Sequence, residues 1–242
     1  MYVETHTRSL FKAVSWRVLG TMATAALVFI ATRRLALSLA IGGIEFVSKV
    51  GLFWLHERIW GRIRLGRRYY DPAVIWLTGF SGSGKSTISD AVAAELRRRG
   101  HQVEQLDGDS VREIFPATGF SRVDRDSHIR RVGFLASVLE RHGVFVVASF
   151  VSPYAESRDF VRGLCRNFVE VHVATSIEEC ERRDTKGLYA RARRGEITQF
   201  TGINDPYEPP SSPELRFDTT AVAVSAASDA VVNHVLKRRG IP

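Results

Sequence analysis

Hydrophobic runs divide the chain into two parts of different character. Residues 18–32 (VLGTMATAALVFIAT) and 35–44 carry no charge, and these two runs flank the basic pair Arg33 and Arg34. From residue 71 onward, short apolar runs alternate with longer segments of helical periodicity. Long uncharged runs are typical of membrane-associated helices, whereas the alternation predicts a parallel sheet between helices. We therefore expect two domains, residues 1–70 and residues 71–242.

The second domain supplies the strands of the expected sheet. Its strongest apolar runs are VIWLT, which precedes a glycine-rich turn, and the runs near residues 103–107, 144–150, 169–173 and 219–226. Continuous apolar runs predict strands that are buried on both faces. The fold class that follows is α/β, a mainly parallel sheet covered by helices on both faces. Ligands bind beyond the carboxyl ends of such strands, so the residues after each strand are candidates for function.

The first domain is predicted to form an α-helical membrane hairpin. At about 1.5 Å per residue the run 18–32 covers about 22 Å, which is shorter than a hydrocarbon core of about 30 Å unless Arg17 and Arg33 extend outward. Glu45 and Lys49 lie four residues apart, share one face of a helix and can neutralise each other. The alternatives are an interfacial amphipathic hairpin and an ordinary helical subdomain packed on the second domain.

Charge separates the two parts further. The chain has 34 basic and 26 acidic residues, of which residues 1–70 hold 11 basic and 3 acidic ones, so the remainder is neutral. A neutral second domain argues against a protein that coats nucleic acid, because phosphate neutralisation needs a basic face. The basic residues on both flanks of the hairpin favour membrane lipid as a partner and place the second domain on the cytoplasmic side.

A phosphate-binding loop follows the first strand of the second domain. Gly79, Gly84, Lys85 and Ser86 satisfy the pattern G-x-x-x-x-G-K-[ST] between a strand and a helix, as the pattern requires. Backbone N–H groups of such a loop surround phosphate oxygens, the lysine bridges them and the serine binds Mg²⁺. A tight turn without a ligand is the alternative. We expect ATP and Mg²⁺ here, with the nucleotide held by Gly79, Phe80, Ser81, Gly82, Ser83, Gly84, Lys85, Ser86 and Thr87.

Charged and aromatic residues follow the second strand. Asp107 and Asp109 flank a glycine, and such carboxylates can hold Mg²⁺ or accept a proton from an attacking hydroxyl, although Asp is also a common helix cap. We expect Asp109 to be catalytic and to bind the metal together with the loop serine. Arg112 and Arg125 suit an anion, and Phe120 can stack on a base.

Two further candidates come later in the chain. Ser152 stands at the end of the third strand, where it can hydrogen-bond a phosphoryl group, become phosphorylated or cap the next helix. Residues 180–210 are rich in Arg, Gly and Thr, and we expect them to form a lid that closes over nucleotide. Lys186 in this lid is one of five lysines in the chain; its compact charge suits a phosphate or sulfate oxygen, and an ordinary surface lysine is the alternative.

The second domain resembles the adenylyl-sulfate kinases over about residues 74–218. The similar motifs, in order, are GFSGSGKST, LDGDSVR, GFSRVDR, IRRVG, FVSPY, ERRDTKGLYARARRGEI and FTGINDPYEPP. The resemblance implies a P-loop kinase fold, a homodimer, and ATP-dependent phosphorylation of the ribose 3'-hydroxyl of adenosine 5'-phosphosulfate (APS). It assigns Ser152 to a proposed phosphoserine position. It also assigns a set of residues to the substrate or its surroundings: Asp107, Asp109, Arg112, Phe120, Arg125, His128, Phe150, Val151, Lys186 and Phe200.

In-line phosphoryl transfer needs positioning and charge neutralisation more than covalent chemistry. We therefore expect direct transfer, with Asp109 orienting the 3'-hydroxyl and Lys85 stabilising the transferred group. Ser110 and His128 stand where the family pattern has asparagines, and a neutral imidazole cannot reproduce the donor and acceptor pair of an amide. A related kinase for another nucleotide-linked acid and a nucleotide-binding regulator of a membrane partner are the alternatives. About residues 6–60 resemble a small two-helix membrane domain of unknown function.

Overall fold

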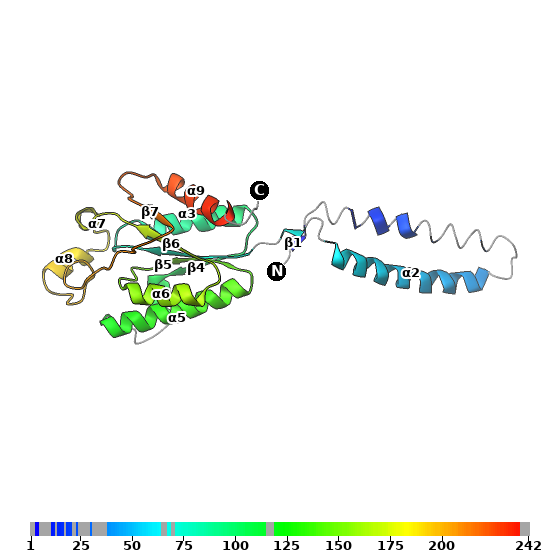
Figure 1. Ribbon diagram of the computed structural model, residues 1–242, viewed down its shortest axis with the longest axis horizontal. Coiled ribbons are helices and arrows are strands. Elements are labelled where there is room, and N and C mark those ends of the chain that lie inside the picture. Colours follow the sequence, from blue (N-terminus) through cyan, green and yellow to red (C-terminus); the bar gives the residue numbers. More distant parts are fainter. Residues whose placement is uncertain are drawn as a thin grey trace. The chain divides into compact units, whose positions relative to one another are not determined.

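The computed structural model forms two compact units, which we describe separately: an N-terminal unit, Met1–Tyr70, and a C-terminal unit, Asp71–Pro242 (Figure 1). The residues that it describes are 3–4, 11–12, 14–16, 18–20, 23, 30, 38–63, 67–68, 71–114 and 119–237.

The C-terminal unit contains a five-stranded parallel sheet. Its strand order is β4-β5-β3-β6-β7. The bounds are β3 Val74–Thr78, β4 Val103–Asp107, β5 Phe145–Ser149, β6 Phe168–Val173 and β7 Leu215–Phe217. Every residue of β3, β5 and β6 is buried, as expected for central strands that carry helices on both faces. The predicted α/β class and parallel sheet are confirmed.

Helices cover both faces of this sheet (Figure 1). One face carries α3 Lys85–Arg98 and α9 Val224–Lys237, and the other carries α5 Arg122–Arg141 and α6 Ala155–Leu164. The shorter helices are α4 Gly108–Ile114, α7 Ile177–Arg183 and α8 Leu188–Arg193. A capping box begins α5, because the Ser121 hydroxyl accepts from the Asp124 amide and the Asp124 carboxylate accepts from the Ser121 amide.

The strand predicted near residues 219–226 is wrong. The final strand, β7, ends at Phe217, and the Asp218 carboxylate then accepts hydrogen bonds from the amide and hydroxyl of Thr220. This turn leads into α9, which buries Ala227, Val231 and Val235. The run 219–226 thus forms this turn and the exposed start of α9, and burial begins only at Ala227, where apolar residues recur every three to four positions along one helix face.

The N-terminal unit contains α2 Ser38–Arg62 and a short antiparallel pair, β1 Val3–Glu4 with β2 Arg67–Arg68. Residues 14–16 and 18–20 are helical and belong to the segment that packs on α2. Within the described ranges, none of the helices combines the length and apolarity needed to cross a membrane. The predicted α-helical membrane hairpin therefore has no helix in those ranges that would span the bilayer. Glu45 and Lys49 interrupt the apolar run of α2, and most of the run 18–32 lies outside the described residues.

Candidate active site

The phosphate-binding loop lies between β3 and α3. Gly79, Gly82 and Gly84 all have positive φ, at 152°, 75° and 98°. A Cβ on Gly79 would lie 2.4 Å from the carbonyl oxygen of Val173, so the loop can pass this close to β6 only with glycine there. The helix that follows, α3, starts at Lys85. Its N-terminal N–H groups and the positive end of its dipole therefore point toward the loop.

Lys85 is buried inside this loop. Its ammonium donates to the carbonyl oxygens of Gly79 at 3.0 Å and Phe80 at 2.6 Å, and lies 3.4 Å from the Ser83 hydroxyl. Burial lowers the pKa of Lys85 to about 8, and the charges of Cys180 and Asp107 oppose that shift. The carbonyl oxygens of Gly79 and Phe80 thus stabilise the charged form of a lysine that burial disfavours.

Two threonines support the loop from behind. The hydroxyls of Thr175 and Thr219 each donate to the carbonyl oxygen of Ser83 at 3.0 Å. Arg183 in turn donates to the Thr219 hydroxyl at 2.8 Å. None of these three residues was predicted from the sequence. Thr175 and Thr219 follow β6 and β7, so the rule that function follows the strand ends could have found them.

The acidic pair follows β4. The Ser86 hydroxyl donates to the Asp107 carboxylate at 3.3 Å, and that carboxylate also accepts from the backbone N–H of Asp109 at 3.0 Å. Asp109 itself forms an ion pair with Lys186. A hydroxyl and a carboxylate at this separation fit Mg²⁺, which prefers hard oxygen ligands and shares its shell with phosphate and water. The geometry therefore favours Asp107 over Asp109 as the carboxylate that binds the metal with Ser86.

One cavity of about 1010 Å³ joins the loop to the acceptor side. The cavity lining includes each predicted site residue except Gly79, Phe80 and Ser83, and is contributed by the loop, α4, α5, the end of β5 and the lid. Phe80 instead packs on Tyr207, with ring centroids 4.9 Å apart. Among the predicted substrate residues, Arg112 lies over the ring of Phe120 at 4.7 Å. The cavity is thus lined by phosphate-binding groups at one side and by paired arginine and aromatic groups at the other.

His128 lies in this cavity with 1% of its surface exposed. Its ring meets Phe150 edge to face, with centroids 5.9 Å apart. Burial lowers the pKa of His128 to about 4, and Arg112 and Arg131 lower it further. The imidazole is therefore neutral at physiological pH. This is the form that was compared with an amide side chain on the basis of the sequence.

Ser152 has a φ of 38°, in the left-handed region that favours glycine. It is 2% exposed, and its hydroxyl accepts from the indole N–H of Trp76 at 3.1 Å and donates to Thr78 at 3.0 Å. Both partners belong to β3, so these bonds hold the hydroxyl in the interior. This geometry favours a positioning role for Ser152 over a covalent one.

Comparison with known proteins agrees with this geometry. A family model described as Adenylylsulphate kinase matches residues 71–218, and one described as Predicted membrane protein (DUF2061) matches residues 10–61. The chain is 52% identical over 165 residues to an adenylyl-sulfate kinase of Gloeothece citriformis, covering 68% of this chain and 92% of that protein. This chain belongs to the adenylyl-sulfate kinase family.

Other members of the adenylyl-sulfate kinase family extend this similarity. A probable adenylyl-sulfate kinase of Pseudomonas aeruginosa is 51% identical over 147 residues, covering 60% of this chain and 69% of that protein. The solved APS kinase CysC of Mycobacterium tuberculosis, in complex with AMPPNP and APS, aligns with a TM-score of 0.66 and 38% identity. That alignment covers 70% of this chain and 99% of the solved one.

The lid of this adenylyl-sulfate kinase family member is held at both ends. Near its start, the Tyr189 hydroxyl donates to the carbonyl oxygen of Ser81 at 2.9 Å, and the Tyr189 and Phe200 rings meet edge to face at 4.8 Å. Toward its end, Arg125 donates to Thr201 and to the carbonyl oxygen of Gln199. Arg125 was predicted to bind substrate, and the structure adds that it anchors the lid.

Arg158 joins the end of the lid to the loop after β5. It donates to the carbonyl oxygens of Ser152 at 2.6 Å and Glu208 at 2.7 Å, and to the Glu170 carboxylate at 2.8 Å. Arg158 and Tyr154, whose hydroxyl donates to Asp205 at 2.9 Å, were not predicted. The chain contains 29 arginines, so residue type alone could not single out this one.

Proposed function

We propose that this chain transfers the γ-phosphoryl group of ATP to the 3'-hydroxyl of APS, giving 3'-phosphoadenylyl sulfate for sulfate assimilation. The observation that carries the proposal is the single cavity in which the phosphate-binding loop and acidic pair face Arg112, Arg125, Phe120 and Phe200. Phosphoryl transfer requires a donor and an acceptor in one enclosed site, aligned with each other. Membership of the adenylyl-sulfate kinase family supports this choice of acceptor.

The reaction forms a bond from the 3'-oxygen to the γ-phosphorus and breaks the bond from that phosphorus to the β,γ-bridging oxygen, so ADP leaves. Asp109 orients the hydroxyl and takes its proton, which requires Lys186 to release the carboxylate. Lys85 donates to oxygens of the transferred group. Ser86 and Asp107 would hold Mg²⁺, which supplies neutralisation of phosphate charge when bound.

The test is turnover of the purified full-length chain with ATP, Mg²⁺ and APS, followed by ADP release and by the mass of the product. Asp109→Asn keeps the size of the side chain and removes the carboxylate, so we expect turnover to fall about 10²- to 10⁴-fold. Asp159→Asn is the matched control, because Asp159 is exposed on α6 and outside the cavity lining, and it should leave turnover unchanged. Unaltered activity of Asp109→Asn would refute the assigned role.

Direct transfer is proposed over a route through phosphorylated Ser152, because the Ser152 hydroxyl is engaged by Trp76 and Thr78. Ser152→Ala should retain measurable turnover, with a loss of no more than about 10- to 100-fold through altered positioning, since no covalent step depends on the hydroxyl. A labelled phosphoserine that forms and decays during turnover would establish the covalent route instead.

A different nucleotide-linked acid is the second candidate for the acceptor. His128 and Ser110 support it, because both positions lack the amide of the family pattern and His128 is a buried wall of the cavity. A panel of nucleotide acceptors, assayed with the native chain and with His128→Asn, separates the two candidates. ATP binding without turnover on any acceptor would favour a regulatory module.

We also propose that residues 1–70 attach the kinase to the cytoplasmic face of a membrane. The match of residues 10–61 to a membrane-protein family and the 11 basic residues of this segment support the proposal. Recovery of the full-length chain in the soluble fraction after detergent-free cell fractionation would refute it. A homodimer remains a prediction for light scattering of the purified chain.

A further inference from the structure

We propose that Thr175 and Thr219 are positioning residues for the nucleotide: they hold the peptide between Ser83 and Gly84 so that its N–H faces the phosphates of ATP. This inference rests on the ATP site proposed above and goes beyond it, because neither threonine belongs to the phosphate-binding loop. The loop pattern supplies N–H groups, but it does not fix which way each peptide faces. The observations that carry the proposal are two convergent hydroxyls, the planarity of the peptide, and a glycine that can adopt either orientation.

Two hydroxyls meet at the carbonyl oxygen of Ser83. Thr175 and Thr219 each donate to it at 3.0 Å. The threonines follow β6 and β7, which are neighbours in the sheet, so the fold brings them together although 44 residues separate them. A carbonyl oxygen has two lone pairs, and the two hydroxyls occupy both. Ser83 and Thr175 are 0% and 1% exposed, so water does not compete for these bonds.

The hydrogens of both hydroxyls are directed toward Ser83. Arg183 donates to the Thr219 hydroxyl oxygen at 2.8 Å, and the backbone N–H of Thr219 donates to the Thr175 hydroxyl oxygen at 3.3 Å. Each hydroxyl oxygen therefore accepts one hydrogen bond and keeps its own hydrogen for the carbonyl. Glu179 forms an ion pair with Arg183 at 2.7 Å, which holds the guanidinium in place. Removing either hydroxyl leaves the other as a donor to the same carbonyl.

Peptide planarity converts this anchor into the placement of a donor. The C=O and N–H groups of a trans peptide point in opposite directions. Because the Ser83 carbonyl points toward the threonines, the N–H of Gly84 points away from them. Gly84 lines the cavity, whereas Ser83 and Thr175 are buried behind it. The two threonines thus hold an N–H donor toward the phosphate site before the nucleotide arrives, as electrostatic preorganisation requires.

Gly84 makes this orientation depend on the threonines. Its φ is 98°, and glycine adopts either sign of φ, so a reversal of the Ser83–Gly84 peptide meets little steric resistance. The reversed peptide would present a carbonyl oxygen to the phosphates, which replaces an attractive dipole by a repulsive one. A Cβ on Gly84 would lie 3.1 Å from the Thr219 methyl, so Thr219 also packs closely against this residue. Hydrogen bonding by the hydroxyls therefore selects the productive orientation.

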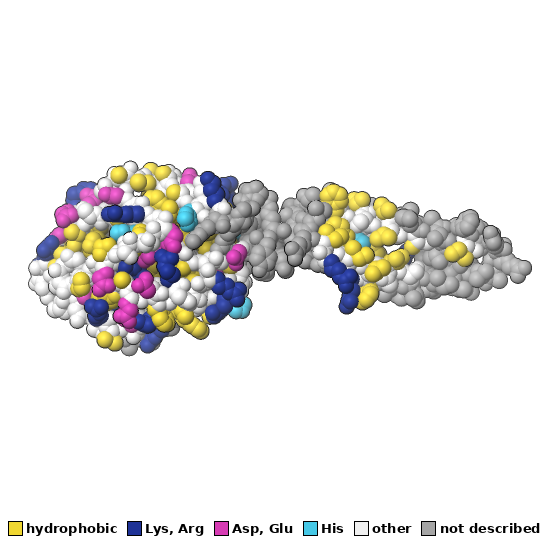
Figure 2. Space-filling view, viewed as in Figure 1, with side chains coloured by type: hydrophobic (Ala, Val, Ile, Leu, Met, Phe, Trp, Pro, Cys, Tyr) yellow, Lys and Arg dark blue, Asp and Glu magenta, His cyan; other side chains and the backbone are white. Residues whose placement is uncertain are grey.

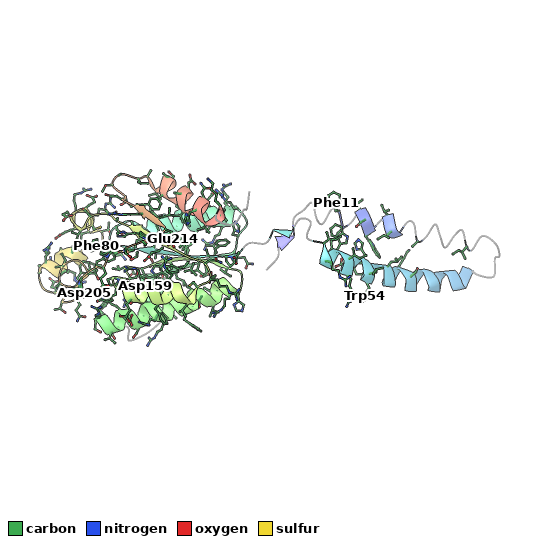
Figure 3. All side chains as sticks on the ribbon, viewed as in Figure 1. Phe11, Trp54, Phe80, Asp159, Asp205 and Glu214 are labelled. Atoms are coloured by element: carbon green, nitrogen blue, oxygen red, sulfur yellow. The ribbon has the colours of Figure 1, made fainter. Side chains whose placement is uncertain are left out.

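The surface of the C-terminal unit does not substitute for these local donors. Residues 71–242 carry equal numbers of basic and acidic side chains, and Figure 2 shows both kinds intermixed on the visible face of this unit. The phosphate-binding loop, which Figure 3 locates by the label of its residue Phe80, therefore attracts phosphate mainly through Lys85 and its own oriented N–H groups. The orientation of one peptide then has a measurable effect on nucleotide affinity.

The test is calorimetric titration of the purified full-length chain with Mg²⁺ and ADP, which carries the bound phosphates without allowing turnover. The double variant Thr175→Val/Thr219→Val removes both hydroxyls and keeps both methyl groups. The double variant Thr175→Ser/Thr219→Ser keeps both hydroxyls and removes the methyl groups. Thr220→Val is the matched control, because the neighbouring Thr220 hydroxyl donates to Asp218 and lies outside the cavity lining. Thermal unfolding without nucleotide checks that each variant folds, and steady-state kinetics give the KM for ATP and for APS.

We expect the valine double variant to bind ADP at least about tenfold more weakly, because phosphate loses a charge-assisted hydrogen bond. Each single valine variant should lose about two- to fivefold, since one hydroxyl remains. The serine double variant and Thr220→Val should stay within about twofold of the native chain. The KM for ATP should rise in the valine variants while the KM for APS changes by less than about twofold.

Native ADP affinity in the valine double variant would overturn the proposal. Equal losses in the valine and serine double variants would also overturn it, because packing and not hydrogen bonding would then be responsible. If the valine double variant does not fold, native affinity in both single variants is the overturning result. A native chain that binds ADP but does not phosphorylate APS would refute the proposed function alone, because the ADP comparison does not depend on the acceptor.

Discussion

The central strands of the C-terminal unit bury their large apolar side chains, whereas α2 of the N-terminal unit exposes several. Val74, Ile75 and Trp76 of β3 are 0% exposed, but Phe53 and Trp54 of α2 are 51% and 57% exposed. The same residue types thus take opposite positions in one chain. Burial of apolar groups is favourable relative to water, and the exposed apolar residues of α2 lie in the segment that matches a membrane-protein family.

The polar interiors of the two units differ as well. In the C-terminal unit, Arg158 and Glu170 are buried charges with short hydrogen bonds, and they hold the loop of Ser152 against the lid. In the N-terminal unit, Ser15, His56 and Trp60, here called the polar seam, share hydrogen bonds without an acid–base ion pair. Removing one member of a buried ion pair strands the other, whereas a neutral seam loses a modest hydrogen bond. The following predictions test this contrast.

The largest effect is expected for Arg158→Met. Loss of the guanidinium leaves the Glu170 carboxylate with Arg162 alone and releases two backbone carbonyls, so the free energy of unfolding should fall by about 3 to 5 kcal/mol. Denaturant titration measures it, followed by Trp76 emission in a background where Trp16, Trp54 and Trp60 are replaced by Phe. Arg182→Met is the control, because that exposed arginine pairs with Glu179 at the surface and should cost no more than about 1 kcal/mol. Similar losses in the two variants would contradict the assignment of buried charge as the interaction that stabilises the loop of Ser152.

An intermediate effect is expected from pH. The pKa of Lys85 is lowered to about 8, so the folded chain loses this charge before the unfolded chain does as the pH rises. Between about pH 8 and 10 the unfolded state binds more protons at this group, so its contribution to stability rises with pH. The kcat/KM for ATP should fall over the same range, because phosphate loses its cationic partner. An activity profile that stays flat up to pH 10 would contradict this assignment.

The smallest effect is expected for His56→Leu in the polar seam. Trp60 keeps its hydrogen bond to Ser15, so the loss of stability should be about 0.6 kcal/mol and no more than about 1.7 kcal/mol. Unfolding in lipid bicelles measures it, and kinase turnover in the same sample should not change. A loss comparable with that of Arg158→Met would show that removing a polar group destabilises the two interiors equally.

The features that could be predicted from the sequence are those that local patterns specify. The phosphate-binding loop needs only residues 79–86 in order, and three of the five strands, β3, β5 and β6, are largely apolar runs with helices between them. The fifth strand was misplaced because the alanine and valine run after Asp218 forms a turn and the exposed start of α9, and the three-residue β7 carries little pattern of its own.

The remaining site residues depend on contacts across the fold. Thr175 and Thr219 meet at one carbonyl group although 44 residues separate them, and Arg158 reaches Glu208 over 50 residues. In the N-terminal unit, Ser15 and His56 lie 41 residues apart, so the sequence suggested a membrane segment without showing its polar seam. Such contacts are set by tertiary packing, which a single sequence does not display.

The ion pair between Lys186 of the lid and Asp109 suggests how acceptors could be selected. Both side chains are mostly exposed, so the pair is weak and exchanges partners readily. In the proposed reaction, a hydroxyl that approaches Asp109 would displace the Lys186 ammonium, which would then need another anion. A molecule that carries a hydroxyl and an anionic group at a suitable separation satisfies both residues together, whereas water or a simple alcohol satisfies one. Under this proposal, the pair selects acceptors by the distance between their hydroxyl and their anionic group.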